Sequence, residues 1–138
     1  DCARLAPTAK NEQPWLFGTV RKRETLKAIA DLTDNARFIA DAPVCFAVFG
    51  KRAEKYYLED CCAATMQLIL ALQAWGVASC WVAGDKKDYV EDVRTLLNVP
   101  EDYTLVSLVP AGYPEEILIA KKKTLDEVTF FERYEEEE

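Results

Sequence analysis

The feature that most constrains this sequence is a long uncharged stretch in its middle, from Cys61 to Gly84. A membrane-spanning helix needs about 20 predominantly apolar residues, so the length alone would permit one. Four polar side chains interrupt the stretch, and Gly76 is typical of a helix end; the polar residues are Thr65, Gln67, Gln73 and Ser79. The pattern therefore predicts a helix from Tyr57 to Gly76, then a strand over Val77–Val82, and no membrane segment.

The predicted helix is hydrophobic nearly all round, which requires burial on most of its faces. A chain of 138 residues has little interior in which to enclose such a helix. One way to bury it is to pack it against the same helix of a second copy. We therefore expect a homodimer with this helix at the centre of the interface.

The remaining elements predict one domain over residues 1–138. Asp1–Ala6 resembles the last turns of a helix, and the acidic run Glu135–Glu138 is expected to form a solvated end. Because strands alternate with helices, the fold class is α/β, with helices packed on a sheet. Strands are expected at Trp15–Val20, Pro43–Phe49 and Leu105–Val109, and helices at Arg23–Leu32, Asp88–Leu97 and Leu125–Tyr134.

Composition excludes several classes of chemistry. With 17 basic against 24 acidic residues the net charge is -7, which disfavours nucleic acid as a partner. No histidine is present, so Ser-His-Asp and Cys-His catalysis and histidine metal sites are excluded. The five cysteines form an odd number without C-x-x-C spacing, which suggests neither a disulfide framework nor a zinc site. We therefore expect a reducing cytoplasm, and the absence of a secretory leader from this sequence favours the same location. Neither G-x-G-x-x-G nor a P-loop occurs, so any catalysis must depend on another kind of bound cofactor.

The turn from Pro7 to Trp15 carries the densest polar chemistry. It places a hydroxyl, an ammonium and two side-chain amides between two prolines. Such residues often serve only as a capped turn between a helix and a strand, and on composition alone that interpretation is favoured over a binding site.

This turn resembles the Pro-Ser-x-x-Asn-x-Gln-Pro-Trp signature of the FMN-dependent nitroreductase family. Further segments are similar to the family in order and spacing, so that the resemblance covers nearly the whole chain. They are Phe38–Pro43, Glu59-Asp60, Cys80–Gly84, Leu97–Asp102 and Gly112–Pro114. The resemblance implies a mixed, mostly antiparallel sheet flanked by helices, in a homodimer built around a long central helix.

The resemblance also implies which residues hold FMN. Ala83 and Gly84 match the place where the family presents backbone N–H groups near N5 and O4 of the flavin, where a glycine permits close approach. The alternative for these two is an ordinary strand-to-helix turn. From the partner subunit, the turn would offer amides and hydroxyls to the ring without adding charge; its contacting residues would be Pro7, Thr8, Ala9, Asn11 and Gln13.

Lys122 falls near the family's late basic position, which holds the FMN phosphate, although lysine runs are as often simply solvated. Two features depart from the family pattern. The arginine-rich opening segment that also grips the phosphate is missing from this sequence, and we expect that the first helix region is absent. Cys61-Cys62 stands where relatives often have smaller residues, and a packing role for these thiols is favoured over a redox role.

The family resemblance therefore implies an enzyme in which FMN carries the chemistry. It would take hydride from NADH or NADPH and reduce a nitroaromatic, a quinone or a similar flat acceptor by ping-pong turnover. No side chain need act as a catalytic acid. The alternatives are a non-catalytic flavin- or small-molecule-binding dimer and an interaction module that shares only the fold.

Overall fold

Strands β2 and β5 form the centre of a sheet. The computed structural model describes residues 1–117 and 119–134, and within them the sheet has five strands in the order β1-β2-β5-β3, with β4 paired to β5 as well. Every described strand pair is antiparallel. The acidic run 135–138 lies outside the described residues. The strands are β1 (Trp15–Val20), β2 (Val44–Lys51), β3 (Ala78–Ser79), β4 (Val82–Ala83) and β5 (Tyr103–Gly112).

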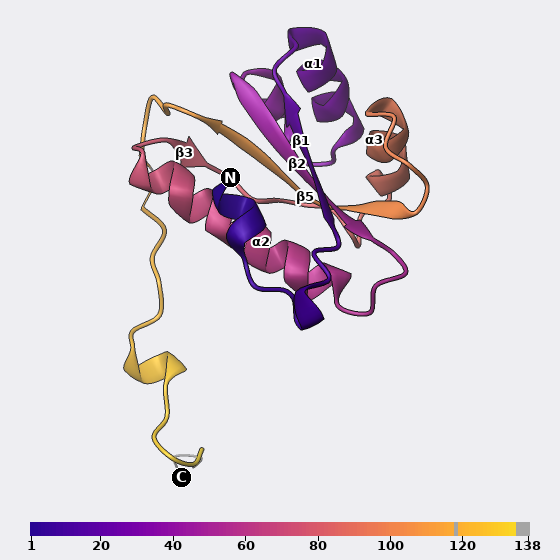
Figure 1. Cartoon of the computed structure of the whole chain (residues 1–138). Helices are drawn as coiled ribbons and strands as arrows, with labels where there is room; N and C mark the ends of the chain where they lie inside the picture. The colour runs from indigo at the N-terminus through magenta and orange to yellow at the C-terminus, as the bar shows by residue number, and fades with distance from the viewer. Residues whose placement is uncertain (118, 135–138) are drawn as a thin grey trace.

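Helices cover both faces of this sheet (Figure 1). Helices α1 (Arg23–Leu32) and α3 (Val90–Leu96) pack on one face, and α2 (Tyr57–Ala74) crosses the other. The short 3-10 helix η1 (Cys2–Leu5) lies against α2. Three further 3-10 helices are described, η2 (Ala9–Asn11), η3 (Arg37–Ala40) and η4 (Asp126–Val128).

The core is divided by the sheet into two parts. The larger part lies under α1 and α3 and contains fully buried apolar side chains, among them Leu26, Ile29, Val93, Leu105 and Leu108. The smaller part joins α2 to the sheet through Cys61, Val48 and Val106. Here α2 also buries a polar pair, because the Thr65 hydroxyl donates to the Cys61 carbonyl at 2.7 Å and lies 2.8 Å from the Ser107 hydroxyl. Both hydroxyls are thus satisfied inside the protein.

Helix α2 ends where Gly76 was expected to stop it. Gly76 has a φ of +73°, the left-handed conformation that glycine adopts without strain. The Gly76 N–H donates to the Gln73 carbonyl and the Val77 N–H to the Leu72 carbonyl, each at 2.9 Å, which is the Schellman ending. Opposite the buried face, Leu70 is 57% exposed, and Trp75, directly after the helix, is 83% exposed. Within one copy, therefore, α2 is covered on one side only.

Several predicted elements are confirmed. Strand β1 and helix α1 have the predicted bounds, and the helix–sheet class with its antiparallel sheet is as the resemblance implied. Strand β2 begins one residue after Pro43, β5 is longer at both ends than Leu105–Val109, and α3 is shorter than Asp88–Leu97. The opening residues form only the 3-10 helix η1.

The predicted strand Val77–Val82 is wrong as a continuous element. It divides into β3 and β4, with Cys80 and Trp81 between them. The Cys80 N–H still donates to the Pro110 carbonyl at 3.2 Å. Since proline has no N–H, Pro110 cannot return the second hydrogen bond of the antiparallel pair, and the ladder is interrupted there.

The predicted helix Leu125–Tyr134 is also wrong, because only the short η4 forms in this segment. The segment from Tyr113 to the end of the described chain extends away from the body (Figure 1). Among the described residues of this segment the large apolar side chains are exposed, Phe131 at 90%. Short helices without a packed face are marginal in water, which explains the result.

The long helix α2 is not a membrane span. Among the residues that the structure describes, no helix combines the length and the apolar character that crossing a bilayer requires.

Candidate flavin site

The predicted turn is held in an unusual backbone conformation. Lys10, Asn11 and Gln13 have φ values of 53°, 59° and 51°, in the left-handed region that costs a residue with a side chain roughly 1–2 kcal/mol. Inside the turn, the Gln13 N–H donates to the Thr8 hydroxyl oxygen at 3.2 Å, and the Gln13 side-chain amide donates to the Asn11 carbonyl at 3.3 Å. The turn is therefore strained and held together by its own side chains.

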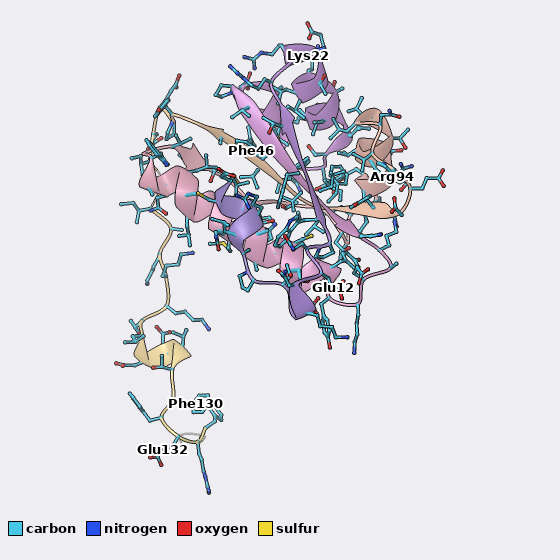
Figure 2. All side chains as sticks on the ribbon, in the orientation of Figure 1. Glu12, Lys22, Phe46, Arg94, Phe130 and Glu132 are labelled. Atoms are coloured by element: carbon cyan, nitrogen blue, oxygen red, sulfur yellow. The ribbon has the colours of Figure 1, made fainter. Side chains whose placement is uncertain are left out.

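This turn lies at the amino-terminal end of α2. The Ala9 N–H donates to Asp60 Oδ1 at 3.2 Å, across 51 positions of sequence. Figure 2 shows Glu12, which belongs to the same turn, near the start of that helix. Pro7, Asn11 and Gln13 are exposed, and Thr8 and Ala9 are half-buried. Their polar groups are thus available to a molecule outside the chain.

The second predicted segment, at the end of β4, is fixed by a glycine. A Cβ at Gly84 would lie 2.7 Å from the carbonyl carbon and oxygen of Val106. The Gly84 N–H donates to that Val106 oxygen at 3.0 Å. From the sequence, Gly84 was predicted to let the backbone approach a planar ligand. In the structure, the lack of a side chain at Gly84 instead lets this segment approach β5.

The outer edge of β4 is consequently the backbone of Ala83. Ala83 lies opposite Ser107 of β5. It falls between Val82, which lies opposite Leu108, and Gly84, whose N–H is bonded to Val106. Because N–H and C=O groups alternate in direction along an antiparallel strand, those of Ala83 point away from β5. The Tyr89 hydroxyl donates to the Ala83 carbonyl. Ala83, rather than Gly84, thus has the N–H that can serve a ligand.

An apolar hollow adjoins this edge. A cavity of about 220 Å³ is lined by Ala83, Trp81, Phe38 and Tyr89, among others, and Lys87 pairs with Asp34 at 3.2 Å on its rim. A shallower groove of about 730 Å³ shares Phe38 and Cys80 with it and continues along β3. Flat, largely apolar groups fit surfaces of this kind.

A tyrosine connects the end of β4 to α2. The Tyr57 hydroxyl donates to the Asp85 carboxylate at 2.7 Å, directly after Gly84. Burial, together with the adjacent Asp85, raises the pKa of Tyr57 to about 12. The phenol is therefore protonated, and acts as a donor, at neutral pH.

The vicinal cysteines pack rather than react. Cys61 is fully buried, and its thiol lies 3.5 Å from the Phe49 carbonyl. Burial raises the pKa of Cys61 to about 12 and also raises the pKa of Cys62. A thiolate is the reactive form of cysteine, so neither group is set up as a nucleophile at neutral pH.

The structure thus brings two of the three predicted segments to α2 but not the third. Lys122 is exposed and belongs to the C-terminal segment, which extends away from the body of the molecule (Figure 1). Sequence reasoning missed the contacts of Tyr57, Asp60 and Asp85. The sequence marks Tyr57 and Asp60 only as part of the opening of the long helix, and no local pattern signals contacts that join such distant positions.

Comparison with known proteins gives the family. A sequence model described as the nitroreductase family matches residues 33–113. A protein of Archaeoglobus fulgidus, provisionally described as an NADH dehydrogenase/NAD(P)H nitroreductase, is 34% identical over 120 residues, covering 83% of this chain and 69% of the relative.

Solved structures share the fold. One from Bacteroides thetaiotaomicron, with the same provisional description, superposes with a TM-score of 0.90 at 28% identity, covering 96% of this chain and 80% of that one. An iodotyrosine deiodinase with bound FMN and 3-iodo-L-tyrosine superposes with a TM-score of 0.70 at 22% identity, covering 94% and 84%. The second likeness concerns the fold alone.

The fold and the family match place the chain among the flavin-dependent oxidoreductases. It belongs to the nitroreductase family, and the resemblance read from the sequence is confirmed.

The glycine at the end of β4 yields a stability prediction. Gly84→Ala should lower the free energy of unfolding by about 2 kcal/mol, because the new methyl group would overlap backbone atoms that have no room to move. Gly18→Ala is the matched control, since its Cβ would lie 3.5 Å from Ala47 Cβ, an ordinary contact. Urea unfolding of both variants measures the difference. Equal stability of the two would contradict the close approach of β4 to β5.

Proposed function

We propose that this chain is an FMN-dependent NAD(P)H oxidoreductase that reduces nitroaromatics, quinones or similar flat acceptors by ping-pong hydride transfer. The observation that carries the proposal is the outward N–H of Ala83 at the open edge of β4, next to an apolar hollow. FMN, when bound, supplies the hydride chemistry. Family membership and the provisional descriptions of the relatives support this activity.

The chain's own part is to bind and orient the ring. The Ala83 N–H, which points away from β5, would donate a hydrogen bond to the bound flavin, a neutral contact that would favour the reduced ring. From the partner subunit, Thr8, Asn11 and Gln13 supply neutral donors and acceptors for the polar edge, with Pro7 and Ala9 packing beside them. Lys122 would balance the phosphate charge, although within one copy its segment extends away from the body of the molecule (Figure 1). No histidine is needed for any of these tasks.

A second copy completes the site in this proposal. The uncovered side of α2 exposes Met66 and Leu70, Trp75 is exposed directly after the helix, and the C-terminal segment exposes further apolar side chains. Exposed apolar surface of this extent is typical of a protein interface. The homodimer buries α2 against α2 and brings the turn of one subunit to the flavin of the other.

A reducing, cytoplasmic location accords with the cysteines. All five are free, and Cys45 and Cys61 are buried within the core without a partner thiol. Disulfides are characteristic of oxidising compartments, and none joins these five cysteines.

Colour tests the activity. The purified protein should be yellow, should take up FMN when it is stripped and reloaded, and should bleach without oxygen on addition of NADPH or NADH. A nitroaromatic or quinone should then restore the colour. Yellow protein that neither donor bleaches would instead indicate a non-catalytic flavin-binding dimer. Colourless protein that FMN cannot reconstitute would contradict a flavin site and leave an interaction module.

A proline at position 83 tests the backbone donor. Ala83→Pro removes the outward N–H without breaking a ladder bond to β5, a position at which strands accept proline. Flavin reduction by NAD(P)H should slow about tenfold, the effect of one lost hydrogen bond to developing charge. Ala83→Ser keeps the N–H and should reduce its flavin at the wild-type rate. Stopped-flow absorbance measures both, and equal rates in the two variants would refute the role of Ala83.

A charge on the open side of α2 tests the dimer. Leu70→Glu should convert the dimer into a monomer that loses FMN during gel filtration, because a carboxylate would be buried between the helices. Leu96→Glu is the control, since Leu96 is comparably exposed but lies on α3. Light scattering gives the masses. A wild-type monomer that binds FMN would disprove the shared site.

A further inference from the structure

We propose that Tyr57 and Asp60, in the first turn of α2, are positioning residues that hold both backbone segments of the flavin site. Asp60 fixes the turn that contains Ala9, and Tyr57, through Asp85, fixes the end of β4. The inference rests on the proposed FMN site, but the two contacts themselves are properties of the chain. Neither residue touches the flavin in this proposal.

Asp60 has little reason to be buried except this contact. Its exposed fraction is 7%, and no ion pair to it occurs among residues 1–117 and 119–134. Burying a carboxylate without a cation is costly, and the positive end of α2 offsets only part of the cost. What the carboxylate gains is the N–H of Ala9, at 3.2 Å. A buried charge placed on a single backbone N–H is well suited to fixing the position of that backbone.

The turn needs such a hold. Its left-handed residues Lys10, Asn11 and Gln13 store strain that an unattached turn would release. The hydrogen bonds from Gln13 join the turn only to itself. At its far end the turn is attached where the Lys51 N–H donates to the Pro14 carbonyl, at 2.8 Å. At the near end η1 packs on α2, and Asp60 supplies the hydrogen bond to the turn itself, so losing it weakens the hold on that end of the turn.

Tyr57 is itself immobilised before it acts on β4. A Cβ added at Gly50 would lie 2.6 Å from Tyr57 Cδ2, so the ring lies directly on the β2 backbone. Its hydroxyl then reaches Asp85 at 2.7 Å. Asp85 directly follows Gly84, whose N–H is bonded to β5. The ring therefore connects the centre of the sheet to the residue that ends the flavin-facing edge.

The two residues are three positions apart, so they lie on the same side of one helical turn. A single rigid element thereby sets the distance between the two segments. In the proposed dimer these segments serve the flavins of different subunits, and the first turn of α2 contributes to both sites. Loss of either contact should therefore affect flavin binding and reduction more than folding.

The experiment uses full-length dimer with and without FMN. For the turn, Asp60→Ala removes the acceptor, Asp60→Asn keeps an acceptor oxygen, and Glu59→Ala removes a neighbouring exposed charge from the same helix end. For β4, Tyr57→Phe removes one hydroxyl, and Tyr56→Phe removes an exposed hydroxyl next to it. Amide hydrogen exchange at Ala9 and Gly84 in the flavin-free protein reads the two contacts directly.

With FMN, Asp60→Ala should raise the dissociation constant about tenfold, the effect of one hydrogen bond to a charged group, and Asp60→Asn should restore most of the affinity. Tyr57→Phe should lower kcat for NAD(P)H oxidation about threefold at an unchanged KM. Exchange should accelerate at Ala9 in Asp60→Ala and at Gly84 in Tyr57→Phe. Glu59→Ala and Tyr56→Phe should match the wild type in every measurement.

The outcomes separate the two hypotheses. If the wild type binds FMN while Asp60→Ala and Tyr57→Phe keep wild-type affinity, kcat and exchange, the positioning role is overturned and the flavin site stands. If the wild type takes up no FMN, the proposed function fails. If, in addition, amide exchange at Ala9 in Asp60→Ala and at Gly84 in Tyr57→Phe equals that of the wild type, the positioning role of the two contacts fails as well. Circular dichroism and the dimer mass must match the wild type. If Asp60→Ala does not fold, Asp60→Leu, which also lacks the acceptor and has a similar size, replaces it.

Discussion

The packing of α2 across the sheet is the constraint on which the rest of the structure depends. One face of the helix is bound to β2 and β5 through Cys61 and a closed pair of hydroxyls, Thr65 and Ser107. These contacts are short and buried, so the helix has little freedom to slide or rotate. Everything attached to α2 inherits that rigidity, including the turn at Ala9 and the end of β4.

Helix α2 serves both the fold and the proposed function. Its buried face completes the core, and its opposite face leaves Leu70 open. A helix with two apolar faces leaves one of them exposed to water in an isolated chain, whereas a dimer can bury both. The uncharged stretch Cys61–Gly84 is therefore explained by two sets of apolar contacts, one within the chain and one proposed between two copies.

Elements with local signals were predictable. Strand β1, helix α1 and the stop at Gly76 were predictable because an apolar, β-prone run, helical spacing and a glycine C-cap each act within a few residues. The break between β3 and β4 was not, because its cause is Pro110 in a strand about 30 positions away. For the same reason the turn was recognised as polar, whereas its attachment to Asp60 was invisible.

Pro110 also has a consequence for how the molecule behaves in a crowded solution. An uninterrupted edge strand offers a row of free N–H and C=O groups onto which foreign strands can assemble. Here the edge beside β5 consists of two fragments, β3 and β4, with an irregular step at Cys80 and Trp81. Each fragment is too short to pair with a foreign strand over any length. By interrupting the ladder, Pro110 therefore also makes edge-to-edge aggregation on this side of the sheet less favourable.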